Sequence, residues 1–132
     1  MTGFNSKHLN HKCDRNGCYI DKLPLWDEWI ECFPRGIRPA DIDGMVEING
    51  RFLFMEEKGL GATLTSGQGY ALRRLARQPN TTVVVFRPGK FSELEVLIFD
   101  ADGSTGYKPF TREQFKDWLR TWAMASEQPG VA

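Results

Sequence analysis

Net charge, cysteine and long apolar runs are all scarce in this chain. Its 132 residues carry 17 basic and 17 acidic side chains, which excludes a strongly basic nucleic-acid clamp but leaves room for a local basic face. Three cysteines are too few for a disulfide scaffold and fit a reducing compartment. No run of about 18 apolar residues occurs, and the N-terminal stretch has no apolar core of the signal-peptide kind. The sequence therefore predicts neither membrane insertion nor export, and we expect a cytoplasmic protein.

The residues that are present describe one globular domain with a polar extension at each end. A length of 132 residues and 41% hydrophobic content suffice for a single core without disulfide or metal staples. Residues 1–22 are polar and rich in turn formers, which predicts an irregular arm. We expect the domain itself at 23–126 and a loose tail at 127–132.

Periodicity and turn residues predict an order of α-β-β-α-β-β-α. The expected helices are 25–33, 66–78 and 111–126, and the expected strands are 42–48, 51–58, 81–86 and 94–99. Asn49-Gly50 separates the first two strands and is the strongest short hairpin signal. Strand 51–58 is apolar on both faces, which predicts a central position in the sheet. The expected fold class is α/β or α+β, with a central mixed sheet of about four strands flanked by helices.

The end of strand 51–58 carries charges that are costly to desolvate. Side chains two apart share a face of a strand, so Glu56 and Lys58 point the same way and Glu57 points the other way. A two-residue turn at Asn49-Gly50 places Asp43 opposite Glu56. Two such carboxylates repel each other unless a cation lies between them, and Mg²⁺ or Mn²⁺ suits oxygen ligands. Lys58 could then stabilise an attacking water or charge developing on a phosphate. The simpler interpretation is an exposed ion pair at a strand end.

Gln68 is the polar member of the apolar face of helix 66–78. At about 100° per residue it shares its arc with Leu72 and Leu75, near the helix start and close to the end of the Lys58 strand. It could orient a substrate phosphate, a water molecule or Lys58. The alternative is a glutamine at a helix start that bonds free backbone amides.

A basic stripe occupies the opposite arc of the same helix. It comprises Arg73, Arg74 and Arg77, and Arg35 and Arg38 precede Asp43 in the chain. These side chains could contact DNA phosphates, although such a stripe is often only a solvated face. Nothing resembles a recognition helix, so we expect shape-based binding instead of sequence reading.

The arm contains side chains of the types that bind zinc, namely His8, His11, Cys13 and Cys18. The spacing of the two cysteines is not distinctive, and no second cysteine pair follows. Two interpretations stay open: reduced thiols around a turn, or a structural Zn²⁺ site in a zinc-stabilised adaptor.

Asp43-Gly44, followed on the next strand by Glu56-x-Lys58, resembles the PD-(D/E)XK nuclease superfamily. In that resemblance Asp43 is the motif aspartate, Glu56 the second acidic residue and Lys58 the lysine. The continuation EEKGLGATLTSGQ is similar to the virus-type replication-repair nuclease (VRR-NUC) branch, in which a glycine-containing loop and a glutamine, here Gln68, follow the lysine. The string CFPRGIRPADIDG looks like proteins encoded by bacteriophages and prophages. The motif proline departs from the pattern, since Pro39 precedes Asp43 by four residues.

The resemblance implies a restriction-endonuclease-like core and a metal-dependent deoxyribonuclease, directed by DNA structure more than by sequence. Asp43 and Glu56 would hold Mg²⁺ or Mn²⁺, Lys58 would assist the water, and Gln68 would position it. DNA would be the partner, with a homodimer as one option, in the cytoplasm of a bacterial host; no membrane and no organic cofactor are expected. The alternative is the same fold kept as a catalytically silent module that binds nucleic acid or a host protein.

Overall fold

The computed structural model describes residues 27–128. The chain divides into two compact units, residues 1–41 and 42–132, and each is described by itself. In the first unit the described elements are helix α2 (Asp27–Ile30) and the 3-10 turn η1 (Pro34–Gly36). The predicted arm, 1–22, and the start of the predicted first helix lie outside the described residues.

The prediction of a helix over 25–33 is wrong at its C-terminal end, because α2 stops at Ile30. The amides of Cys32 and Phe33 donate to the carbonyls of Trp29 and Ile30 at 3.0 and 3.1 Å, the three-residue spacing of tight turns. Phe33 is extended, with φ −105° and ψ 143°. The cause is Pro34, because the ring of a proline disfavours the helical conformation of the residue before it.

The second unit is built on a six-stranded mixed sheet. Its strands are β1 (Gly44–Ile48), β2 (Arg51–Glu57), β3 (Thr81–Pro88), β4 (Leu94–Asp100), β5 (Gly103–Ser104) and β6 (Lys108–Phe110). β2 and β3 are parallel and the other pairs are antiparallel. β2 lies between β1 and β3, which confirms the predicted central position. The short strands β5 and β6 were not predicted.

The β1–β2 hairpin has the predicted register, in which Ile48 pairs with Arg51 and Gly44 with Met55. Asn49 and Gly50 have φ values of 52° and 81°. Two consecutive left-handed residues give a turn whose twist matches that of the strands, and Asn-Gly is the sequence that best tolerates it. The chain then crosses from β2 to the parallel β3 through a helix, as a parallel pair requires.

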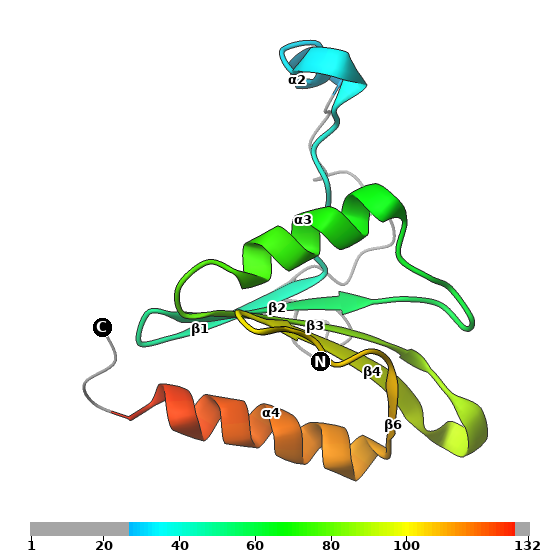
Figure 1. The fold of residues 1–132 in the computed structure, drawn as a ribbon, viewed down its shortest axis with the longest axis vertical. Helices are drawn as coiled ribbons and strands as arrows, with labels where there is room; N and C mark the ends of the chain where they lie inside the picture. The colour runs from blue at the N-terminus through cyan, green and yellow to red at the C-terminus, as the bar shows by residue number, and fades with distance from the viewer. Residues whose placement is uncertain (1–26, 129–132) are drawn as a thin grey trace, which may run out of the picture. The chain divides into compact units, whose positions relative to one another are not determined.

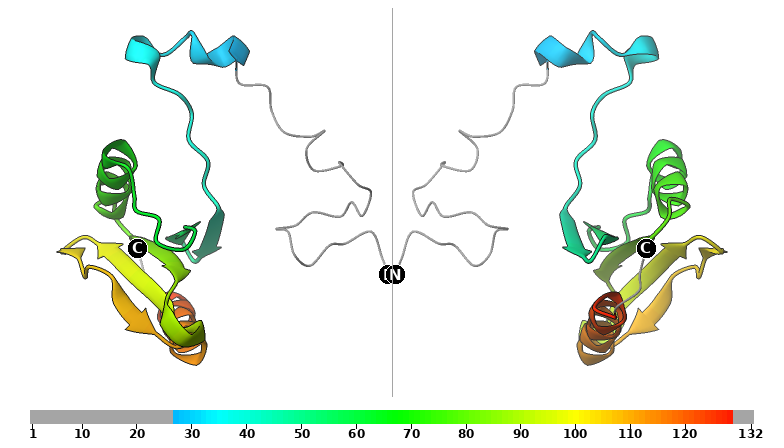
Figure 2. Two further views of the ribbon diagram at one scale, coloured as in Figure 1. Left: turned by 90° about the vertical axis from the view of Figure 1, so that its right-hand side faces the viewer. Right: turned by 90° about the vertical axis from the view of Figure 1, so that its left-hand side faces the viewer.

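Two helices cover the two faces of the sheet. Helix α3 (Ser66–Ala76) packs on one face and α4 (Arg112–Ser126) on the other (Figures 1 and 2). The mixed α/β class with flanking helices is therefore confirmed. Among the described residues, no helix has both the length and the apolar character needed to span a bilayer.

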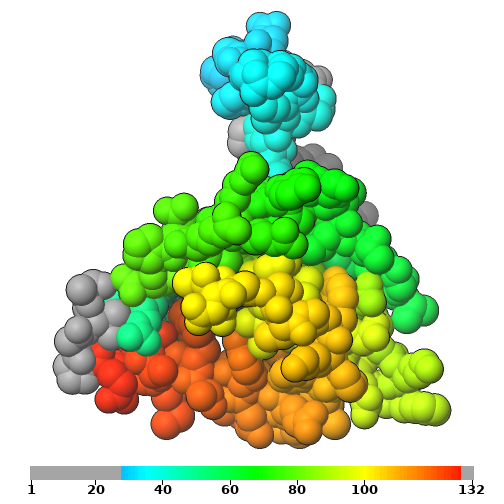
Figure 3. Space-filling model, viewed as in Figure 1, coloured from blue at the N-terminus to red at the C-terminus, as the bar shows by residue number. Residues whose placement is uncertain are grey.

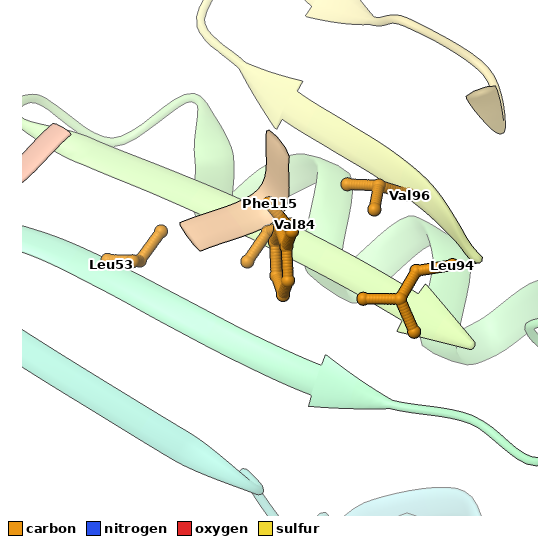
Figure 4. Close-up of a cluster of buried hydrophobic side chains, with 5 residues drawn as sticks. All are labelled: Leu53, Val84, Leu94, Val96 and Phe115. Carbon is orange, nitrogen blue, oxygen red and sulfur yellow. The ribbon is translucent and has the colours of Figure 1, made fainter. Parts of the chain in front are cut away.

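The core is split by the sheet into two buried clusters. The cluster beneath α4 consists of Leu53, Val84, Leu94, Val96 and Phe115 (Figure 4). The cluster beneath α3 consists of Ala76, Val83, Val85, Leu97 and Phe99. Consecutive valines of β3 alternate between the two clusters, as strand geometry requires. The interior strands β2 and β3 are thereby fixed from both sides.

The turn of the hairpin also contacts the far end of α4. The side-chain amide of Asn49 donates to the carbonyl of Ser126, and Arg51 Nη1 donates to the carbonyl of Ala125, each at 3.2 Å. The last carbonyls of a helix have no partner within it, and a cation there is favourable. The hairpin therefore caps the C-terminus of α4 across 77 and 74 residues of sequence.

Candidate functional site

Four backbone segments meet at one edge of the sheet. β2 and β3 are parallel, so their C-terminal ends lie together; Glu57 pairs with Phe86, and the Lys58 amide donates to the Phe86 carbonyl at 2.9 Å. β1 runs antiparallel to β2 and begins at this edge with Gly44. α3 starts nearby, after the loop that follows β2 (Figure 1).

Lys58 and Gln68 both contact Glu56 at this edge, and we call these three residues the edge cluster. Glu56 Oε2 accepts a hydrogen bond from Gln68 Nε2 at 2.7 Å and lies 3.2 Å from Lys58 Nζ. Only 9% of Glu56 is exposed, and 20% of the Lys58 side chain. A carboxylate this buried is stable only when charged or polar donors replace its water. The convergence of Glu56 and Lys58 that strand parity predicted is therefore present.

The start of α3 directs Gln68 toward Glu56. Thr65 is the N-cap residue, and its hydroxyl oxygen accepts from the Gln68 amide at 3.2 Å. The apolar face of α3, with Leu72 and Leu75, packs on the sheet beside it. The threonine thus satisfies the helix amide. The sequence left open that the Gln68 side chain bonds free backbone amides at the helix start. In the structure this side chain donates instead to the Glu56 carboxylate.

Asp43 lies beside the edge cluster without contacting it. The β1–β2 ladder ends at Gly44 and Met55, one step short of the predicted Asp43–Glu56 pair. Asp43 Oδ2 accepts from the backbone amide of Glu57 at 2.8 Å, and both residues are exposed. The aspartate therefore reaches the main chain next to Glu56 instead of the Glu56 carboxylate.

The carboxylates at this edge limit the kind of metal site that could form here. Within residues 27–128, no group of three or more His, Cys, Asp or Glu side chains is placed to hold a metal ion. Asp43 Oδ1 and Glu56 Oε1 have no hydrogen-bond partner in that range. Mg²⁺ is commonly bound by one or two carboxylates, with water and substrate phosphate completing its shell. Asp43 and Glu56 are the two carboxylates at this edge that such an arrangement would use.

The predicted basic and zinc residues are placed as follows. Arg73 and Arg74 are exposed on α3, Arg77 is exposed directly after its last residue, and the Arg74 guanidinium lies 5.7 Å from the Tyr70 ring centre. Arg35 and Arg38 are exposed in the first unit, which is described separately from the edge cluster. The candidate zinc ligands His8, His11, Cys13 and Cys18 lie outside the described residues.

Arg87 is a residue of this edge that the sequence reasoning missed. The predicted strand stops at residue 86, but β3 continues through Pro88. Arg87 Nη1 donates to the Ala62 carbonyl at 2.6 Å, and its Nε to Glu95 Oε1 at 2.9 Å. Its guanidinium also lies 3.8 Å from the ring centre of Tyr107. Arg87 thus connects the β2–α3 loop, which leads to Gln68, to β4 and to the segment after β4. Had the predicted strand been extended by two residues, strand alternation would have placed the Arg87 side chain on the same face as the buried Val83 and Val85.

Comparisons with known proteins identified no relative of this chain. No family model matches the chain, and searches of curated proteins and of solved structures found no match. The edge cluster, Asp43 and the arginines of α3 are therefore the observations from which a function can be inferred.

Proposed function

We propose that this chain is a metal-dependent nuclease that hydrolyses DNA phosphodiester bonds, on a restriction-endonuclease-like core of the PD-(D/E)XK type. The observation that carries the proposal is the edge cluster, a buried Glu56 held by Lys58 and Gln68 at the end of an interior strand. Asp43 begins the neighbouring strand and contacts the backbone one residue beyond Glu56. An acidic pair could bind a metal ion, and a lysine and a glutamine beside it could position water and stabilise charge on a phosphate, which are roles that phosphodiester hydrolysis uses.

Asp43 and Glu56 are the residues that would hold Mg²⁺. When bound, Mg²⁺ would polarise a phosphoryl oxygen and lower the pKa of a coordinated water. Lys58 carries three donors on a flexible stem, so it can hold the attacking water and stabilise negative charge on the phosphate. Gln68 donates to Glu56 and so fixes the orientation of that carboxylate.

Helix α3 would supply the contacts to the DNA backbone. Arg73 and Arg74 are exposed on it and Arg77 is exposed at its C-cap, and none of the three has an acidic partner within residues 27–128. Phosphate contacts of this kind position the duplex without reading its sequence. With a net charge of zero, binding would be modest and would weaken as salt increases.

Cleavage of linear, branched and single-stranded DNA in Mg²⁺ or Mn²⁺ tests the proposal. Lys58→Ala should lower the rate by about 100-fold or more, as expected for removal of a group that stabilises transition-state charge. Lys116→Ala is the matched control, because that lysine is exposed on α4. Cleavage by Lys58→Ala at the rate of the control would refute the assigned mechanism.

The second candidate is a catalytically silent module that binds nucleic acid or a host protein. It is favoured by the hydrogen bonding of Glu56, whose Oε2 is already satisfied by Lys58 and Gln68. An ion pair of this kind is stable without a metal. DNA binding with no turnover at any Mg²⁺ or Mn²⁺ concentration would favour this candidate.

A further inference from the structure

The loop between β3 and β4 holds an aromatic ring in solvent. It contains the 3-10 turn η2 (Lys90–Ser92), and Phe91 at its centre is 93% exposed. This is the highest exposure of any large apolar side chain among residues 27–128. Phe86, Phe110 and Phe115 of the same unit all pack in the cluster beneath α4. Single exposed apolar residues are common on proteins, so exposure alone assigns no role to Phe91.

The backbone that carries Phe91 is strained and fixed. Phe91 and Ser92 have φ values of 53° and 64°, in the left-handed region that bulky residues rarely adopt. Two hydrogen bonds close the loop, from the Gly89 amide to the Glu93 carbonyl at 2.8 Å and from the Glu93 amide to the Lys90 carbonyl at 2.9 Å. Strain of this kind persists where the surroundings enforce it, and it is a reason to look for a function.

The loop leaves the same sheet edge as the edge cluster. Phe86 is level with Glu57, and β3 continues by two residues to Pro88, which pairs with Leu94. At about 3.3 Å per residue, the loop starts about 7 Å beyond that level. Stacked bases are about 3.4 Å apart along each strand, so this corresponds to roughly two nucleotides. In the space-filling view the β3–β4 loop, coloured lime-green, projects from the body of the unit (Figure 3).

The chemistry of the loop fits a nucleic-acid strand. Lys90, next to Phe91, is exposed and has no acidic partner within the described residues. An aromatic face for a base beside a cation for a phosphate is the combination that proteins use for single strands. On the β2–α3 loop, which follows β2 at the same edge, Leu60 is 79% exposed. It offers a second, smaller apolar surface that a base could contact.

We propose that Phe91 is a base-stacking residue that directs the edge cluster to DNA with unpaired bases, such as flaps, junctions and strand ends. The proposal rests on the proposed nuclease function and names its substrate class. In a duplex, insertion of a ring must first separate stacked bases, whereas an unpaired base offers its face without that cost. Phe91 would therefore discriminate between these DNA forms without reading sequence.

Binding without divalent metal tests this inference separately from catalysis. The probes are a fluorescent linear duplex and the same duplex with a single-stranded flap that contains 2-aminopurine. Phe91→Ala should weaken flap binding about tenfold and abolish the quenching of 2-aminopurine, with duplex binding changed less than about twofold. Phe91→Trp should restore both signals. Met124→Ala, which removes a side chain 67% exposed on α4, is the matched control and should behave as the wild type.

The outcomes separate this inference from the nuclease proposal. Equal flap binding and equal quenching by Phe91→Ala and the wild type, alongside metal-dependent cleavage, would overturn the stacking role alone. Absence of binding to every DNA form together with absence of cleavage would overturn both. Circular dichroism of Phe91→Ala should match the wild type, because the ring makes no core contact.

Discussion

Replacing Glu56 with glutamine would remove the charge of the edge cluster while keeping the size of the side chain. The carboxylate oxygen Oε2 now receives both Gln68 Nε2 at 2.7 Å and Lys58 Nζ at 3.2 Å. A glutamine at this position can keep its carbonyl oxygen where Oε2 now lies, so that Gln68 and Lys58 meet a neutral acceptor in place of a charged one. Lys58, only 20% exposed in its side chain, would lose its counter-charge. We therefore expect Glu56→Gln to destabilise the folded state.

The size of the effect follows from the two contacts. A hydrogen bond to a charged group contributes about 1.5–3 kcal/mol and a neutral one about 0.5–1.5 kcal/mol, so each conversion costs about 1 kcal/mol. Water at the exposed part of Lys58 recovers some of this loss. We expect the free energy of unfolding to fall by about 1–2 kcal/mol. For a unit of this size, that lowers Tm by roughly 5–15 °C.

Urea and thermal unfolding without divalent metal would measure the change. A double-mutant cycle with Lys58→Met should give a coupling energy of at least about 0.5 kcal/mol, because the two groups are in contact. Glu113→Gln is the matched control, since that glutamate is 74% exposed in its side chain and pairs with Lys116 on the surface of α4. Equal stability of Glu56→Gln and Glu113→Gln would refute the reasoning, as would a coupling energy of zero.

Two further predictions concern the N-terminal cap of α4 and the β2–α3 loop. Thr111→Ala removes the capping box of α4 and should lower the free energy of unfolding by about 1 kcal/mol in urea denaturation. Thr121→Ala, at an exposed position within the same helix, should leave it unchanged or raise it slightly, and equal losses would contradict the capping argument. Arg87→Met should loosen the β2–α3 loop, measured as faster amide hydrogen exchange in that loop with the sheet unaffected. Unchanged exchange there would show that Arg87 does not restrain the loop.

The parts of the structure that the sequence predicted depend on local rules. Asn49-Gly50 favours a two-residue turn, and that turn fixes the register of the whole hairpin. Strand parity then places Glu56 and Lys58 on one face, and helical periodicity places Gln68 on the buried side of α3. Each inference spans a short stretch of chain, so few tertiary contacts could override it.

The parts that were missed depend on contacts between distant segments. Arg87 bonds the Ala62 carbonyl across 25 residues, and no periodic pattern encodes that partner. Asp43 bonds the Glu57 amide because the ladder ends one step early, which the turn rule does not describe. The strands β5 and β6 have two and three residues, too few to show an alternation of apolar and polar side chains. β6 also contains Pro109, which has no backbone N–H to donate to a neighbouring strand and therefore argues against a strand in the sequence.

The contact between the hairpin turn and the end of α4 also bears on how the chain is made. Asn49 and Arg51 are translated early, but the carbonyls they bind belong to residues 77 and 74 positions later. During synthesis these two hydrogen bonds cannot form until α4 has left the ribosome, and until then the side chains of Asn49 and Arg51 are bonded to water. Closing so long a loop is slow, which makes this contact a late event in folding. If synthesis stopped before α4 emerged, the sheet could be covered by α3 on one face but not by α4 on the other. The apolar side chains that α4 normally covers would then be exposed to solvent and available to chaperones.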